Sequence, residues 1–270
     1  MKIGKKYFEI GKRTYIMGIL NITPDSFSDG GRYNTIDMAL KRAEEMLEEG
    51  ADIIDVGGES TRPGHPIIDE QEEIRRVVPV IEAIVKKFVI PVSVDTSKTI
   101  VAKSAIEAGA QMVNDIWGVR AQKGMAELIA KEQVAYCMMH NKENNEYISI
   151  INEIKTSFAN QTSIFLKKGV KKEQIILDPG IGFAKNLEQN LYVMKHLNTL
   201  KELGYPLLLG TSRKSMIGLT LNLPVEERLE GTLATTAFGV SQGCDFVRVH
   251  DIKANLRAAQ MTDAICRAEL

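Results

Sequence analysis

The sequence predicts an α/β fold, a (β/α)8 barrel with a short N-terminal β-hairpin. Short apolar runs recur along the 270 residues, and each is followed by a longer stretch with helical periodicity. The apolar residues of each run are consecutive rather than alternating, which is typical of parallel strands covered on both faces. Several helical stretches also end on glycine, the residue for which a left-handed C-cap is easiest.

The elements follow one another regularly from the N-terminus. Residues 7–18 look like a hairpin that turns at Gly11 and plugs the base of the barrel. Strands are expected at 15–20, 52–57, 90–95, 111–115, 134–140, 174–178, 206–212 and 245–250. The clearest amphipathic helices are expected at 36–50, 69–87, 97–109, 149–169 and 186–204, and four of them close on Gly50, Gly109, Gly169 and Gly204.

This count of elements fits a single barrel domain over residues 1–270. The rival is an open, doubly wound parallel sheet, which usually shows a glycine-rich first turn. The only candidate for that turn, SDGGRY at 28–33, lacks the GxGxxG spacing. The pattern therefore favours the barrel.

Composition and charge narrow the classes of function. The formal net charge of −1 at pH 7 gives no long-range field, so we expect no nucleic-acid and no membrane partner. The N-terminus lacks the apolar run of a signal peptide, and no stretch approaches the ~18 apolar residues of a transmembrane helix. We expect a cytoplasmic protein whose three cysteines, which form no CxxC pair, are thiols.

Polar side chains stand at the carboxyl end of every expected strand, where barrels of this kind build their sites. Asp95 and Asp178 are each the last residue of an apolar run, a place where an unpaired carboxylate is costly. With Asn114 they offer acceptors and an amide that suit a flat heterocycle with N–H donors, such as an aminopyrimidinone. A metal site is the competing interpretation of the two aspartates, although the set lacks a close third acid or histidine.

The rim also carries cations that together could hold a diphosphate, namely Arg62, Lys214, Arg248 and His250. Arg248 is the most informative of them because it lies within an apolar strand. Ser215 is expected near a helix N-terminus, where backbone N–H groups favour an anion. Two loops rich in Gly, Pro, Ser and Asp, 21–33 and 57–66, are interpreted as mobile lids.

Seven segments resemble those of the dihydropteroate synthases, in order and in spacing. MGILNITPDSFSDGG (17–31) and IIDVGGESTRPG (53–64) look like the two signature segments of that family. The later ones are SVDT (93–96), VNDIWG (113–118), LDPGIGFAK (177–185), GTSRKSMIG (210–218) and VRVHD (247–251). The resemblance covers essentially the whole chain.

The resemblance implies a TIM barrel and a transferase of folate biosynthesis. The reaction would join (7,8-dihydropterin-6-yl)methyl diphosphate to 4-aminobenzoate, giving 7,8-dihydropteroate and diphosphate. The resemblance also implies Mg²⁺ as cofactor, a homodimer formed through the last helices, and sulfonamides as competitors for the aminobenzoate pocket.

Residue roles follow from the same resemblance. The pterin would be bound by Asp95, Asn114, Asp178, Lys214 and Arg248, and all of these except Asn114 would be catalytic. The diphosphate would be held by Asn21, Thr61, Arg62, Arg248 and His250, with Asn21 also placing Mg²⁺. The aminobenzoate pocket would be formed by Phe27, Thr61, Pro63, Phe183 and Ser215.

Two other functions stay open on the sequence. A pterin-binding methyltransferase that passes a methyl group from a reduced folate to a corrinoid would share the acids and the amide. It would not need the TPDSF loop, the STRPG loop, Arg248 or His250. A catalytically silent pterin-binding homologue should have lost a motif residue, and none is lost here.

Overall fold

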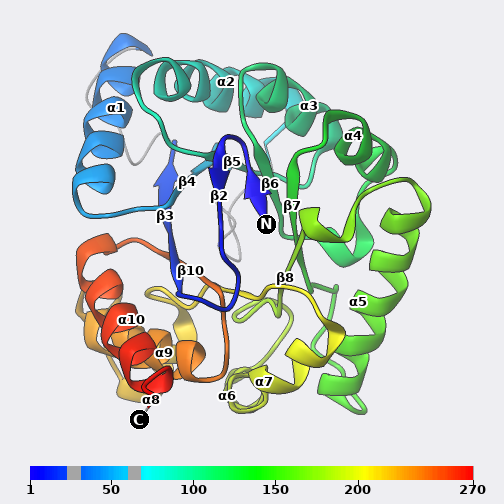
Figure 1. The fold of residues 1–270 in the computed structure, drawn as a ribbon, viewed down its shortest axis with the longest axis vertical. Coiled ribbons are helices and arrows are strands. Elements are labelled where there is room, and N and C mark those ends of the chain that lie inside the picture. The colour runs from blue at the N-terminus through cyan, green and yellow to red at the C-terminus, as the bar shows by residue number, and fades with distance from the viewer. Residues whose placement is uncertain (23–31, 60–67, 270) are drawn as a thin grey trace.

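The computed structural model describes residues 1–22, 32–59 and 68–269, with side chains from 36 onward in the second range. A sheet of eight parallel strands curls into a ring with helices outside it (Figure 1). The strands are β3 (Tyr15–Asn21), β4 (Ile53–Gly57), β5 (Val92–Asp95), β6 (Met112–Asp115), β7 (Ala135–Met139), β8 (Ile175–Asp178), β9 (Leu208–Leu209) and β10 (Phe246–Val249). Their order is β8-β7-β6-β5-β4-β3-β10-β9, and a parallel bridge from Leu177 to Leu207 joins the two edges. The predicted barrel is confirmed.

The helices occupy the connections between strands. They are α1 (Arg32–Glu48), α2 (Glu70–Lys87), α3 (Thr99–Glu107), α4 (Met125–Glu132), α5 (Ile150–Lys167), α6 (Leu187–Lys195), α7 (Leu197–Leu200), α8 (Ser215–Leu221), α9 (Leu229–Ser241) and α10 (Ile252–Cys266). Short 3₁₀ turns lie at η2 (Gly118–Arg120), η3 (Lys172–Gln174), η4 (Lys201–Leu203) and η5 (Val225–Glu227). In the described ranges, no helix combines the length and the apolar content that crossing a bilayer requires.

Local sequence explains where several helices begin and end. The Asp69 carboxylate accepts a hydrogen bond from the Glu72 N–H and starts α2. Asn186 and Gln189 form a reciprocal capping box at the start of α6. All four glycines expected to end helices have positive φ: Gly50, Gly109, Gly169 and Gly204.

The N-terminal hairpin lies earlier than the sequence predicted. Strands β1 (Lys2–Ile3) and β2 (Lys6–Tyr7) pair antiparallel around Gly4, which has a φ of 57°. The expectation of a hairpin over 7–18 was wrong because the residues from Tyr15 onward pair in parallel with β10. Gly11, with a φ of 82°, belongs to the link between hairpin and barrel.

The hairpin has the expected place at the base of the barrel, and lies over the centre of the ring in Figure 1. Ile3 and Phe8 are fully buried in a small cluster with inward-facing residues of the strands, among them Met17, Ile53 and Phe246. Phe8 packs on Tyr15 with ring centroids 4.8 Å apart. This cluster fills one end of the barrel interior and leaves the other end for different side chains.

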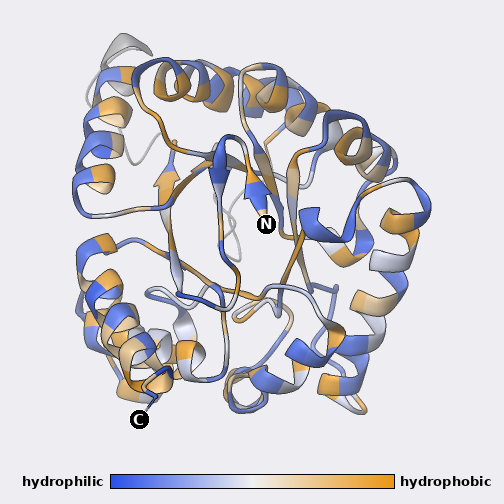
Figure 2. Cartoon of the chain, viewed as in Figure 1, coloured by the Kyte–Doolittle hydropathy of each residue, from blue (hydrophilic) through white to orange (hydrophobic). Residues whose placement is uncertain are grey.

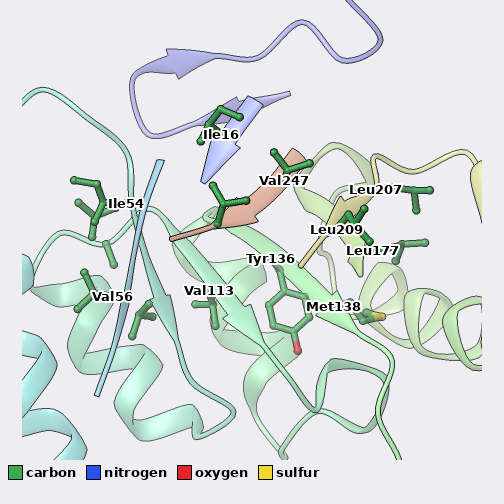
Figure 3. Close-up of a cluster of buried hydrophobic side chains, with 14 of the residues drawn as sticks. Ile16, Ile54, Val56, Val113, Tyr136, Met138, Leu177, Leu207, Leu209 and Val247 are labelled. Carbon is green, nitrogen blue, oxygen red and sulfur yellow. The ribbon is translucent and has the colours of Figure 1, made fainter. Parts of the chain in front are cut away.

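The alternate strand residues face outward into the larger core beneath the helices. Figure 3 shows part of it, including Ile54, Val113 and Tyr136. The helices that cover it carry hydrophobic and hydrophilic residues side by side, as Figure 2 shows. Because successive strand residues point to opposite faces, this outer core also fixes which residues point into the barrel.

Candidate active site at the barrel mouth

On most of these strands the inward-facing side chains change from apolar to polar between one inward position and the next; on β5 both positions are polar. Each polar residue lies two positions after an inward-facing one, in the same phase. The pairs are Ile53 and Asp55, Ser93 and Asp95, Met112 and Asn114, Ile176 and Asp178, and Phe246 and Arg248. We call Asp55, Asp95, Asn114, Asp178 and Arg248 the polar layer; it lies toward the carboxyl ends of the strands.

Arg248 links two acids of the polar layer. Its Nε donates to Asp55 Oδ2 and its Nη2 donates to Asp95 Oδ2, both at 2.6 Å. Asn114 Nδ2 donates to the same Asp55 oxygen at 3.0 Å. Asp55 is fully buried and therefore orients two other members of the layer at once.

Asp55 is a functional candidate that the sequence reasoning missed. It lies inside the apolar run DIIDVG rather than at its end, so a search for strand-terminal polar residues passes over it. The available signal was its position in the strand: Asp55 lies two residues before Gly57 at the end of β4, so the two residues face the same side of the sheet. The same reasoning that singled out Arg248 within its apolar strand applies to Asp55.

Burial shifts the pKa values of several ionisable groups in the mouth away from their usual range. Burial raises the pKa of Asp95 to about 7, although Arg248 opposes the shift, and the nearby Asp55 carboxylate adds to it. Burial also raises the pKa of Asp178, against the influence of Lys214. Burial lowers the pKa of Lys214 to about 8, although Asp178 opposes this. Groups displaced in this way are characteristic of functional sites.

Acceptors in this region lack partners among the described atoms. Asp55 Oδ1, Asp95 Oδ1 and Ser93 Oγ are buried and make no hydrogen bond there. Buried polar atoms in proteins are nearly always paired. A flat heterocycle that brings N–H groups into the mouth would satisfy the carboxylate oxygens.

Lys214 and Asp178 approach one another above Gly210. A Cβ atom placed on Gly210 would lie 3.7 Å from Lys214 Nζ and 3.9 Å from Asp178 Oδ2. The other oxygen of Asp178, Oδ1, accepts from the Gly180 N–H at 2.7 Å. Lys214 Nζ donates to the Ile181 carbonyl and lies 4.8 Å from the centre of the Phe183 ring. The polar layer and the expected aminobenzoate wall therefore share Lys214.

Lys185 fastens the loop that carries Phe183, and it is a second residue that sequence reasoning missed. Its ammonium donates to the carbonyl oxygens of Gly180 and Phe183, each at 3.0 Å, and lies 3.3 Å from His140 Nδ1. Burial lowers the pKa of Lys185 to about 7, while Asp178 opposes the shift. Its place at the end of the segment LDPGIGFAK was the available signal.

His140 is a partner of this loop rather than a free base. Burial, together with the charge of Lys185, lowers the pKa of His140 to about 3, so the ring is neutral. Gly180 has a φ of 69°, and a Cβ there would come within 2.0 Å of the His140 carbonyl oxygen. Only glycine fits this close approach between the two loops.

The remaining expected residues lie around the rim. A Cβ on Gly57 would lie 3.4 Å from Asn21 Oδ1 and 3.5 Å from Asp95 Cβ, so the Asn21 amide stands beside the polar layer. His250 Nδ1 contacts Ser212 Oγ at 2.9 Å. Ser215 is the first residue of α8, as expected. Phe27, Thr61, Arg62 and Pro63 lie outside the described residues.

The two aspartates that suggested a metal site face cations instead. Asp95 pairs with Arg248, and the charge of Lys214 acts on Asp178. Within the ranges that the structure covers, no three or more His, Cys, Asp and Glu side chains gather as a metal site would require. The geometry is that of an organic-ligand site with alternating charges.

Comparison with known proteins agrees with this geometry. Residues 17–250 match the family described as pterin binding enzyme. The dihydropteroate synthase of Clostridium beijerinckii is 62% identical over 99% of this chain and 100% of its own length. A dihydropteroate synthase structure from Clostridium difficile, solved in the presence of pteroic acid, is 54% identical with a TM-score of 0.95 and covers 97% of this chain and 100% of its own.

A Xanthomonas albilineans dihydropteroate synthase solved with 4-aminobenzoic acid is 39% identical. Its TM-score is 0.90, and the match covers 95% of this chain and 94% of that one. Sequence and fold therefore agree over nearly the full length. The chain belongs to the pterin-binding enzyme family, and within that family to the dihydropteroate synthases.

Proposed function

We propose that the barrel mouth joins (7,8-dihydropterin-6-yl)methyl diphosphate to 4-aminobenzoate and releases 7,8-dihydropteroate and diphosphate. This is the reaction of a dihydropteroate synthase, a transferase of folate biosynthesis. The observation that carries the proposal is the polar layer, in which buried carboxylates with unpaired oxygens surround Arg248. Relatives solved with pteroic acid and with 4-aminobenzoic acid support the two substrates.

The pterin ring is placed against the polar layer. Asp95 and Asp178 accept hydrogen bonds from ring N–H and amino groups, and Asn114 and Lys214 complete the edge. When Asp95 and Asp178 are ionised, the layer and Lys214 together hold three carboxylates and two cations, so negative charge is in excess. This excess stabilises positive charge that develops on the dihydropterin when the diphosphate departs.

The chemistry is a displacement at the methylene carbon next to the pterin ring. The carbon–oxygen bond to the diphosphate breaks, and its electron pair leaves with the diphosphate. The amine of 4-aminobenzoate then forms the new carbon–nitrogen bond and loses a proton. Arg248, His250 and Arg62 hold the leaving group by charge, and exclusion of water protects the cation from hydrolysis.

We include Mg²⁺ in the proposal on the chemistry of its ligands. Magnesium commonly keeps several waters and binds one or two protein oxygens together with substrate phosphates. Asn21 Oδ1, beside Asp95 at the mouth, is an oxygen of this kind. When bound, the ion would neutralise charge on the leaving diphosphate.

The aminobenzoate pocket is placed next to Lys214. Phe183 lies against the Lys214 ammonium, and Ser215 begins α8 directly after it. Phe27, Thr61 and Pro63 are proposed to complete the pocket. Sulfonamides, which resemble 4-aminobenzoate in shape and charge, should compete for it.

We also propose a homodimer formed through the last helices. Five large apolar side chains of α8, α9 and α10 are exposed, namely Leu219, Leu221, Phe238, Met261 and Ile265. Helix α9 packs against both α8 and α10, so these side chains can contribute to one face, and a contiguous exposed apolar face marks a protein interface. Sedimentation of the wild type should show a dimer, and Met261→Glu should shift it toward monomer; a monomeric wild type would refute the proposal.

Diphosphate release by purified protein tests the function directly. With Mg²⁺ and the dihydropterin diphosphate, release should depend on added 4-aminobenzoate, and dihydropteroate should accumulate in equal amount. Asp178→Asn and Lys214→Ala should reduce turnover and pterin binding while the protein stays folded. Methyl transfer from a reduced folate to a corrinoid would favour the methyltransferase alternative, and pterin binding without either activity would indicate a silent homologue.

A further inference from the structure

Lys98 binds both ends of the segment 60–67. Its ammonium donates to the Glu59 carboxylate at 2.5 Å and to the Ile68 carbonyl oxygen at 2.8 Å. Glu59 immediately precedes the segment and Ile68 immediately follows it. A third bond of 2.6 Å joins the same ammonium to Glu73 of α2. One side chain therefore ties the two ends of the segment to each other and to an outer helix.

The Lys98 cluster is partly buried, which makes its geometry more definite than that of surface ion pairs. The Glu73 side chain is 2% exposed, and that of Lys98 is 16% exposed. Burial opposes the charged form of Lys98, but hydrogen bonds to Glu59 and Glu73 outweigh it and raise the Lys98 pKa. The ammonium stays charged at neutral pH and can use all three donors.

A neighbouring contact fixes the residue before Glu59. Arg76 of α2 donates from Nη1 to the Gly58 carbonyl oxygen at 3.0 Å and from Nε to Glu72 at 2.8 Å. A Cβ on Gly58 would come within 2.8 Å of Val77 Cγ1, so the backbone packs directly on α2. The end of β4 is thus held by α2 as well as by Lys98.

Lys98 is also connected to the pterin side of the mouth. It follows Asp95 by a short turn in which the Lys98 N–H donates to Thr96 Oγ1 at 3.2 Å. The Thr96 N–H in turn donates to the Asn114 carbonyl oxygen at 3.0 Å. The residue that ties the segment therefore stands on the turn that follows a strand of the polar layer.

We propose that Lys98 is a positioning residue for the second substrate, and that with Glu59, Glu73 and Arg76 it forms a clamp on the ends of segment 60–67. The proposal rests on the roles proposed above for Thr61, Arg62 and Pro63 with diphosphate and 4-aminobenzoate. Holding the ends in advance reduces the conformational freedom lost when those residues engage the substrates. Lys98 touches neither substrate and acts through the segment.

Hydrogen exchange tests the clamp without reference to activity. Glu59→Gln removes the charge of one partner and leaves Lys98 paired with Glu73. The double variant Lys98→Met/Glu73→Gln removes the ammonium without leaving a buried carboxylate unpaired. Backbone amides of residues 58, 59 and 68 should exchange at least about tenfold faster in both, equivalent to about 1.4 kcal/mol of lost protection. Unchanged exchange in both variants overturns the clamp.

The control removes an ion pair of similar length that is more exposed and lies elsewhere on the barrel. Lys155 of α5 and Glu202 of η4 are joined at 2.7 Å, and both lie on elements that follow β7 and β8 rather than β4. Glu202→Gln should leave the exchange of residues 58, 59 and 68 unchanged. Lys98→Arg, which keeps the positive charge beside an unchanged Glu73, should retain most of the exchange protection that the double variant loses.

Kinetics then test whether the clamp serves the second substrate. In both clamp variants the KM for 4-aminobenzoate should rise about tenfold, while binding of 6-hydroxymethylpterin stays within about twofold of the wild type. Faster exchange with an unchanged KM would overturn the positioning role. Thr61→Ala and Arg62→Ala, measured in parallel, distinguish failure of the clamp from failure of the proposed function. If these two variants also leave the KM for 4-aminobenzoate and diphosphate release unchanged, the proposed roles of segment 60–67 fail. The clamp itself is then judged by the hydrogen-exchange result alone.

Discussion

Replacing Asp55 with asparagine removes a buried charge while nearly preserving the shape of the side chain. In the wild type, Asp55 Oδ2 accepts from Arg248 Nε at 2.6 Å and from Asn114 Nδ2 at 3.0 Å, while Oδ1 has no partner among the described atoms. The asparagine oxygen can occupy the Oδ2 position and keep both contacts. Its Nδ2 then falls where Oδ1 was, as a buried donor.

The expected loss follows from these contacts. The substitution replaces an ion pair with a hydrogen bond between the Arg248 cation and a neutral amide oxygen, which weakens the bond by about 1 kcal/mol. An unsatisfied buried donor adds about 1–3 kcal/mol. The free energy of unfolding should therefore fall by about 2–4 kcal/mol in total. Pterin binding and turnover should also weaken, because Arg248 and Asn114 lose their common support. We expect kcat/KM for the dihydropterin diphosphate to fall about 100-fold, equivalent to about 2.7 kcal/mol.

Asp115→Asn is the matched control. Asp115 is equally buried but faces the outer core, where it accepts from the Tyr136 hydroxyl and the Trp117 N–H. That variant should lower the melting temperature and leave pterin affinity intact. Initial rates at saturating 4-aminobenzoate, calorimetric titration with 6-hydroxymethylpterin and thermal unfolding provide the comparison. If Asp55→Asn loses stability but keeps wild-type pterin affinity and kcat/KM, Asp55 does not support the site.

Three further variants test other parts of the structure. Burial raises the pKa of Asp95 to about 7, although Arg248 opposes the shift, so the Asp95 carboxylate forms as pH rises through 7. Pterin affinity, measured by titration, should rise over the same pH interval. Asp95→Asn should remove that pH dependence. By linkage, the raised pKa means that the contribution of Asp95 to the unfolding free energy falls as pH rises from about 4 to about 7. Chemical denaturation of the wild type and of Asp95→Asn over this interval isolates that contribution, and a wild-type minus variant difference that rises with pH would contradict it. Asp52→Ala removes the partner of the half-exposed Arg13 and the acceptor of the buried Ile16 N–H at the barrel base. It should cost about 1–3 kcal/mol of unfolding free energy and leave kcat unchanged, and a large fall in kcat in folded protein would count against a purely structural role. Lys185→Met removes the hydrogen bond to the Phe183 carbonyl, so the KM for 4-aminobenzoate should rise by a larger factor than kcat falls. Equal factors for the rise in KM and the fall in kcat would argue against a positioning role.

The sequence predicted the barrel because strands buried on both faces form short, consecutive apolar runs. All eight expected strands are present, and most agree with the prediction to within two residues at each end. The exception is 206–212, of which only Leu208–Leu209 is strand, since the chain turns from the barrel toward α8 after Gly210. The hairpin was misplaced because its strands, Lys2–Ile3 and Lys6–Tyr7, are too short to show a pattern.

The candidate site was predictable wherever a polar residue ended an apolar run, as Asp95 and Asp178 do. Asp55 was missed because it lies within its run, and only the inward phase of β4 marks it. The Lys98 cluster could not be found from one sequence, because its partners Glu59 and Glu73 come from different elements and meet only when α2 packs against the barrel. A pairing between distant residues leaves no periodic signal in the chain.

The polar layer and the proposed aminobenzoate pocket are held in place by different kinds of contact, so different substitutions should affect them. The polar layer stands on strands whose backbone bonds are made within the sheet, and its side chains hold one another through Arg248. In the proposed site the second substrate is bound by loops instead, and these loops are held by separate hydrogen bonds. Lys185 holds the loop of Phe183, and Lys98 bonds to the residues on either side of segment 60–67. Substitution within the layer should therefore weaken pterin binding first, whereas loss of one of these hydrogen bonds should weaken 4-aminobenzoate binding and leave the pterin in place. Because Lys214 contacts both the layer and the pocket, it is the described residue at which the two effects should be hardest to separate.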